Sequence, residues 1–131
     1  MPIIHLLSKW YQHREYIKSV VFSIGTTSIS DDAFADCSNL TNVTFPMYSS
    51  LASIDNNAFV GCSKLTSIDI PAKVTTIGDN AFRECINLAS INIPADGDLS
   101  SIGNSAFSMC GSLMSISIPN NLVFVLCGVM R

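Results

Sequence analysis

The sequence predicts a repeat solenoid, a single stack of similar coils with short parallel β-strands on one face and short helical or 3-10 turns on the other. Three observations lead to this fold class. The dipeptide Ala-Phe recurs at intervals of 25, 23 and 25 residues, beginning at Ala33, Ala58, Ala81 and Ala106. A Cys follows each Phe by three residues, and a Leu follows each Cys by three. A strand-like phrase that ends in Pro closes every copy.

Size and composition agree with one folded domain. The chain has 131 residues, of which 48% are hydrophobic and 13% charged, so it is not a disordered tail. Seven Lys and Arg stand against ten Asp and Glu, and this acidic balance argues against a nucleic-acid partner. The longest apolar run, from Leu122 to Val129, is far shorter than the roughly twenty residues of a membrane span. Membrane insertion is therefore not expected.

Residues 1–22 are predicted to form an N-terminal cap or degenerate repeat. Shifting the third repeat back by 48 residues places Ile17, Val20 and Phe22 at apolar positions of the later copies. A degenerate repeat therefore precedes the first clear repeat. The stretch also suits an amphipathic helix with its apolar residues near one face. Both interpretations give a cap.

Four clear repeats follow, over residues 23–46, 47–71, 72–94 and 95–119, and each is expected to contain one short strand. Apolar and polar residues alternate in every closing phrase, which places the polar side chains on the outer face, and Pro ends the strand. The outer residues would form a flat, mostly uncharged hydrogen-bonding face that can bind an extended peptide or another protein. A purely solvated strand face is the alternative. The predicted binding residues are Asn42, Thr44, Ser67, Asp69, Ser90, Asn92, Ser115 and Ser117.

The second half of each repeat is predicted to be a short helical turn. Asp32, Asn57, Asn80 and Ser105 stand directly before Ala-Phe, where each would accept hydrogen bonds from the free N–H groups that begin the turn. In a solenoid, equivalent positions of neighbouring coils pack against each other, so the Phe and Cys residues should form columns in the core. A free Cys in a core behaves as a small apolar residue. The predicted core columns are Phe34, Phe59, Phe82 and Phe107, with Cys37, Cys62, Cys85 and Cys110.

One edge of the stack should carry the longer loops. The alternating spacing comes from two extra residues after Pro, within residues 47–50 and 95–98. Insertions at a fixed repeat position map to loops on one edge. Tyr48 is the candidate aromatic contact residue on that edge.

Residues 120–131 are predicted to be an incomplete repeat or C-terminal tail. Leu122 and Val125 begin a fifth copy that receives neither Ala-Phe nor a closing strand. The exposed apolar end, with Phe124 and Val125 as candidate contacts, needs a cover. The tail itself, a second copy of the chain, another protein or the rest of a longer parent chain could supply it, so self-association through this end stays open.

The residues predict neither catalysis nor a metal or cofactor. No Cys-x-x-Cys pair is present, and both His lie within residues 1–22, so zinc is not expected. No nucleophile is paired with a base in a recognisable motif. Asp31, Asp55 and Asp79 precede Ala-Phe, but capping explains them and Gly103 interrupts the column. We therefore expect no enzyme activity.

The frame Leu-x-x-Ile-x-Ile-Pro, followed by Val/Leu-x-x-Ile-Gly-x-x-Ala-Phe-x-x-Cys, closely resembles the 23-residue leucine-rich repeats of BspA-like proteins, also called the Treponema type. The resemblance covers about residues 17–125. It implies a leucine-rich-repeat solenoid and a non-enzymatic module that binds another protein. Cell-surface adhesion and host-protein binding in some members of the family are further implications.

The setting of this function is left open by the sequence. The start of the chain shows no conventional signal peptide, which predicts a cytoplasmic protein, whereas the resemblance implies the cell surface. An intracellular scaffold or a small structural subunit of a larger assembly is the alternative function. Two glycosylation triplets, beginning at Asn39 and Asn42, would matter only in a secreted chain.

Overall fold

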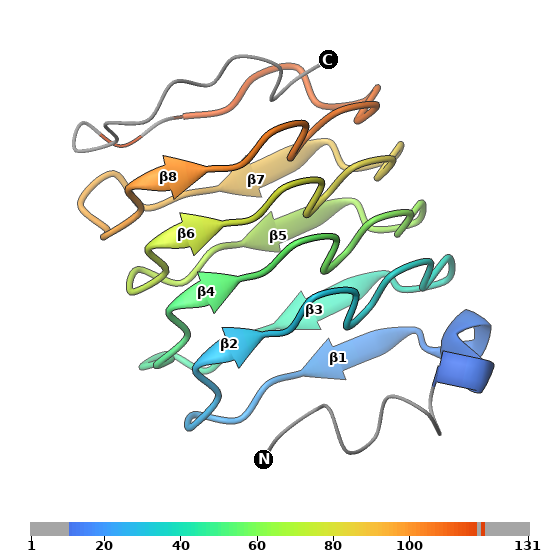
Figure 1. The fold of residues 1–131 in the computed structure, drawn as a ribbon, viewed down its shortest axis with the longest axis horizontal. Coiled ribbons are helices and arrows are strands. Elements are labelled where there is room, and N and C mark those ends of the chain that lie inside the picture. The colour runs from blue at the N-terminus through green and yellow to red at the C-terminus, as the bar shows by residue number, and fades with distance from the viewer. Residues whose placement is uncertain (1–10, 118, 120–131) are drawn as a thin grey trace.

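In the computed structural model, which describes residues 11–117 and 119, the chain winds into a β-solenoid of stacked coils (Figure 1). A 3-10 helix, η1 (Tyr11–Tyr16), precedes the strands. One strand column contains β1 (Ser19–Val21), β3 (Asn42–Thr44), β5 (Ser67–Asp69) and β7 (Ser90–Asn92). The other contains β2 (Ser28–Ile29), β4 (Ser53–Ile54), β6 (Thr76–Ile77) and β8 (Ser101–Ile102). The predicted repeat solenoid with parallel strands is confirmed.

Every strand pair is parallel and joins the same repeat position in neighbouring coils. Val20 lies opposite Val43 in β1 and β3, and Ile68 lies opposite Ile91 in β5 and β7. The strands β2, β4, β6 and β8 form one continuous sheet. Because β1 pairs with β3 in this register, it extends the first column by one coil before the first clear repeat. The part of the predicted cap in residues 1–10 lies outside the described residues.

Each coil also contains a second strand that the sequence did not predict. Its two residues are a Ser or Thr followed by a buried Ile, at Ile29, Ile54, Ile77 and Ile102. Two residues are too few to show a period-2 pattern, so hydrophobic alternation could not reveal this strand. Figure 1 shows the second column in front of the first, so the coils are flattened between two strand columns.

The turns between the two columns have alternating hydrogen bonds. In the first repeat, the N–H groups of Ala33, Ala35 and Cys37 donate to carbonyls three residues earlier, at 3.1 to 3.2 Å, as in a 3-10 turn. The intervening N–H groups, of Asp32, Phe34 and Asp36, donate to carbonyls of the next repeat at 2.7 to 3.0 Å. The same backbone therefore shapes each turn and joins it to the next coil.

The side chains that cap these turns lie one residue earlier than predicted. Asp32, Asn57, Asn80 and Ser105 have left-handed backbone with φ from 57° to 61°, a conformation that short polar side chains tolerate. The acceptor is instead the preceding side chain, which reaches the next coil. Asp31 Oδ1 accepts the N–H of Asn56 at 2.9 Å, and Asn56 Oδ1 accepts the N–H of Asp79 at 2.8 Å.

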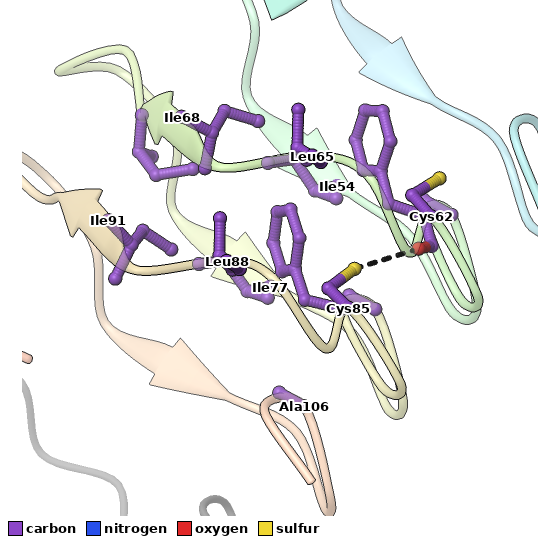
Figure 2. Packing of buried hydrophobic residues seen from close by; sticks show 14 of the residues in the cluster. Ile54, Cys62, Leu65, Ile68, Ile77, Cys85, Leu88, Ile91 and Ala106 are labelled. Atoms are coloured by element: carbon purple, nitrogen blue, oxygen red, sulfur yellow. Dashed lines mark hydrogen bonds between the residues drawn. The ribbon is translucent and has the colours of Figure 1, made fainter. Parts of the chain in front are cut away.

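The core is a set of columns in which each side chain packs on its own counterpart. The rings of Phe34, Phe59, Phe82 and Phe107 are 5.3 to 5.5 Å apart between centroids and within 9° of parallel. All four rings are buried. Figure 2 shows the same order in the aliphatic rows, where Ile54, Leu65 and Ile68 are followed in the next coil by Ile77, Leu88 and Ile91. Such burial stabilises the fold by about 1.5–3 kcal/mol per large apolar side chain.

Candidate functional site

The eight predicted binding residues all lie exposed on the side of the first strand column. Parallel pairing places Ser67 opposite Ser90 and Asp69 opposite Asn92, so the polar side chains form rows across neighbouring coils. Asn92 Nδ2 donates a hydrogen bond to Asp69 Oδ1, which links two coils on this face. Ser115 and Ser117 continue the rows in a segment without a strand assignment. We call this surface the strand face.

The hydrogen-bond ladder of the first column is interrupted between β3 and β5. β1 pairs with β3 and β5 pairs with β7, but no ladder joins β3 to β5, although these strands lie next to each other. Beyond the strand ends, the Phe22 N–H donates to Thr44 O at 3.0 Å and the Ile70 N–H donates to Asn92 O at 2.8 Å. Within the described residues, no corresponding bond joins Phe45 to Asp69. The interruption follows the coil whose loop contains two extra residues.

A cleft of about 320 Å³ opens at this interruption. Residues 45–49 form one wall, and residues 69–73 of the next coil form the other. Tyr48, the predicted edge contact, is 76% exposed, and the neighbouring Met47 is 88% exposed. Sequence patterns singled out Tyr48 but missed the cleft, because its opening depends on how two coils pair. We call this feature the edge cleft.

A second cleft of about 350 Å³ continues from the edge cleft along the strand face. Its lining includes Asn92, Pro94 and Ser117, and it shares Asp69 and Ile70 with the edge cleft. Asp69 therefore lies where the two clefts meet. Among the described residues, neither Asp69 nor the Lys73 of the edge cleft takes part in an ion pair. Both charges are available to a partner.

The four described cysteines form a buried column of free thiols that also hydrogen-bond between coils. The Sγ of Cys62 donates to Phe34 O at 3.2 Å, and Cys85 Sγ donates to Phe59 O at 3.2 Å (Figure 2). Cys110 Sγ donates to Phe82 O at 3.0 Å. The repeat spacing placed Cys in the core but could not show this donor role, which requires the carbonyl of the preceding coil.

Burial suppresses the reactivity of these thiols. Desolvation raises the pKa of Cys37 and of Cys110 from the ordinary value of 9.0 to about 11. It raises the pKa values of Cys62 and Cys85 further, because these thiols lie deeper in the stack. Since the thiolate is the nucleophile, the column is chemically inert while the coils are closed.

We therefore expect the thiol column to react only when the solenoid opens. The experiment uses a Cys127→Ser background, because Cys127 lies outside the described residues. In this background, a thiol reagent at pH 8 should label Cys62 and Cys85 at the rate of unfolding. Cys110, which is 7% exposed at one end of the column, should react before them. Peptide mapping after timed labelling measures the order. Rapid labelling of all four thiols in the native protein would contradict the buried column.

Acidic side chains also lie beside the second strand column. Asp31, Asp55 and Asp79 line a shallow pocket of about 280 Å³. The carboxylates of Asp31 and Asp79 already accept backbone N–H groups of the following coils. Within residues 11–117 and 119, no group of three metal-binding side chains is placed to hold an ion.

Among the described residues, no helix has the length and apolar content of a membrane span. The predicted end contacts Phe124 and Val125 lie outside the described residues.

Comparison with known proteins gives one family and several similar folds. Residues 6–126 match the model of the BspA type leucine-rich repeat region, in six copies. A leucine-rich repeat protein from Bacteroides ovatus is 35% identical over 82% of this chain, with a TM-score of 0.74. The T. pallidum leucine-rich repeat protein is 33% identical over 81% of this chain, also with a TM-score of 0.74. The chain spans 27% and 50% of the lengths of these two structures.

A more distant similarity concerns the fold alone. The pneumococcal vaccine antigen PcpA is 19% identical over 79% of this chain, with a TM-score of 0.66. It has the same stacked-coil architecture at a sequence identity too low to compare sites. The curated proteins include no match to this chain.

Proposed function

Because this chain belongs to the BspA type of leucine-rich repeat proteins, we propose that its strand face binds a partner protein. Leucine-rich repeat proteins are generally protein-interaction modules and are typically non-enzymatic. The observation that carries the proposal is the set of eight exposed polar side chains, in rows across four coils. Backbone bonds and stacked core side chains hold these rows, so a partner meets a preformed surface and little ordering entropy is lost on binding.

Two settings are proposed for this interaction. The family supports adhesion at a cell surface, with a host or matrix protein as the partner. The four buried free thiols support the alternative, a scaffold or small structural subunit inside the cell, because reducing compartments keep thiols free. In both settings the same strand face would bind the partner.

Placing arginine on the strand face tests the proposal. Ser67→Arg and Ser90→Arg each add a long, charged side chain at an exposed position of β5 or β7, where it obstructs a partner without entering the core. We expect either change to weaken binding of the partner by about tenfold or more. The partner is first captured on the full chain from a cell extract of the source organism and, separately, from an extract of host cells and extracellular matrix. Its affinity for each purified variant is then measured.

Ser28→Arg is the matched control, because Ser28 is exposed in β2 of the other strand column. This variant should bind with unchanged affinity. Equal binding by the strand-face variants and the control would reject the strand face as the binding surface. A partner that is lost only from the strand-face variants separates the two settings by its identity. A host or matrix protein indicates adhesion, and a cytosolic protein indicates a scaffold.

A further inference from the structure

We infer that the edge cleft receives an extended segment of a partner protein that presents a large apolar side chain next to a Lys or Arg. This inference rests on the proposed protein-binding function and specifies the chemistry of the partner. It follows from three properties of the cleft: its exposed apolar wall, its position beside the polar rows, and its charge.

The apolar wall provides the anchor for a large side chain. Met47 and Tyr48 are both more than three-quarters exposed, and Phe45 and Pro46 beside them are half-buried. Exposed Met and aromatic side chains around a concave site are typical of the centre of a protein interface, where a buried anchor side chain contributes much of the affinity. The opposite wall adds Ile70, Pro71 and Ala72. An aromatic or large aliphatic side chain can therefore be buried between two coils.

The continuation of the cleft favours an extended segment over an isolated small molecule. From Tyr48 the lined surface passes Asp69 and leads to Asn92 and Ser117 in the second cleft. The amide of Asn92 and the hydroxyl of Ser117 can donate to or accept from a peptide backbone. A segment lying along this line would cross successive coils of the strand face.

The charges determine which neighbour the apolar side chain should have. Asp69 is the charged member of the eight strand-face residues, and its carboxylate lies where the two clefts meet. Residues 23–119 carry nine acidic side chains against three basic ones, so the surrounding field attracts cations. Lys73 lines the same cleft and would repel a second cation. A basic side chain is therefore favoured at Asp69, and the apolar side chain beside Tyr48.

A displayed library of random 12-residue peptides, selected on the immobilised full chain, tests this inference. We expect enriched peptides to share an aromatic or large aliphatic residue next to Lys or Arg. Synthetic copies of the enriched peptides should bind Tyr48→Ser about tenfold more weakly, through loss of the apolar anchor. Asp69→Asn should weaken binding by about threefold to tenfold, and the loss should shrink as salt is added.

Two variants outside the clefts are the matched controls. Asp96→Asn removes an exposed carboxylate from the next long loop, and Met114→Ser removes an apolar side chain that is 89% exposed. Neither residue lines the clefts, so both variants should bind the peptides as the unmodified chain does. Circular dichroism confirms that each variant is folded.

The results separate this inference from the proposed function. Peptides that lose binding with Ser90→Arg but bind Tyr48→Ser and Asp69→Asn normally would overturn the edge cleft and leave the strand face as the binding surface. Enriched peptides that lack the basic residue would overturn the charge assignment. A selection without any enriched peptide would also reject the edge cleft as a peptide-binding site. The strand-face proposal would still be tested separately, by the affinity of the partner for the arginine variants.

Discussion

Replacing Phe82 with alanine is expected to lower the free energy of unfolding by about 3–5 kcal/mol. Phe82 is fully buried, and its ring stacks on Phe59 and Phe107 at centroid distances of 5.3 and 5.5 Å. The change removes a ring that both neighbouring coils contact, so it leaves a cavity in the middle of the aromatic column. In a stack stabilised by contacts between neighbouring coils, such a cavity weakens two coil interfaces at once.

Urea denaturation followed by circular dichroism measures this loss. Met114→Ala is the matched control, because Met114 is 89% exposed and its truncation should change the unfolding free energy by no more than about 0.5 kcal/mol. If Phe82→Ala fails to fold, Phe82→Leu provides the measurement, with a smaller loss expected from the smaller cavity. Unchanged denaturation midpoints for both Phe82 variants would contradict the aromatic column.

Gly78→Ala is expected to lower the free energy of unfolding by about 1–3 kcal/mol, although it adds only one methyl group. A Cβ at position 78 would lie 2.5 Å from Asn56 Oδ1 and 2.7 Å from the Asn56 backbone nitrogen. The same Asn56 Oδ1 accepts the N–H of Asp79, so relief of the contact disturbs a bond between two coils. The preceding repeat has Asp55 at this position, so the constraint at Gly78 comes from the close approach of its own coil to Asn56.

Gly111→Ala is the matched control for this prediction, because a Cβ at position 111 meets no atom within 4 Å. Chemical denaturation of the two variants compares the same substitution with and without the contact between coils. Equal stability of the variants would show that the close approach at Gly78 is not a constraint. Gly103→Ala, which places a Cβ 2.4 Å from Asp79 Oδ1, should resemble Gly78→Ala.

The period of the sequence was sufficient to predict most of the architecture. Ala-Phe-x-x-Cys recurs at nearly constant spacing, and a solenoid brings each repeat position against itself in the next coil. The Phe column, the Cys column and the inward Ile residues of the first strand column therefore follow from spacing alone. The outward positions of the strand face followed in the same way, because side chains alternate along a strand.

Several features of the candidate site required contacts between different repeat positions. The second strand column is too short for a sequence pattern, and its pairing becomes visible only when the coils are stacked. The Asp31 side chain accepts the N–H of Asn56 in the following coil and does not cap its own turn. The hydrogen-bonding side chain therefore lies one residue before the predicted capping position. The thiol of Cys85 likewise donates to a carbonyl of the preceding coil.

The sequence by itself determined the stack, its columns and the side of the coil that faces solvent, because the repeat length decides which residues meet their own counterparts. Only the tertiary structure decided where the stack opens. The edge cleft depends on the missing ladder between β3 and β5, and thus on the path of two adjacent coils that differ by two loop residues. Backbone pairing between coils is a property of their relative path in space, and spacing along the chain does not specify it.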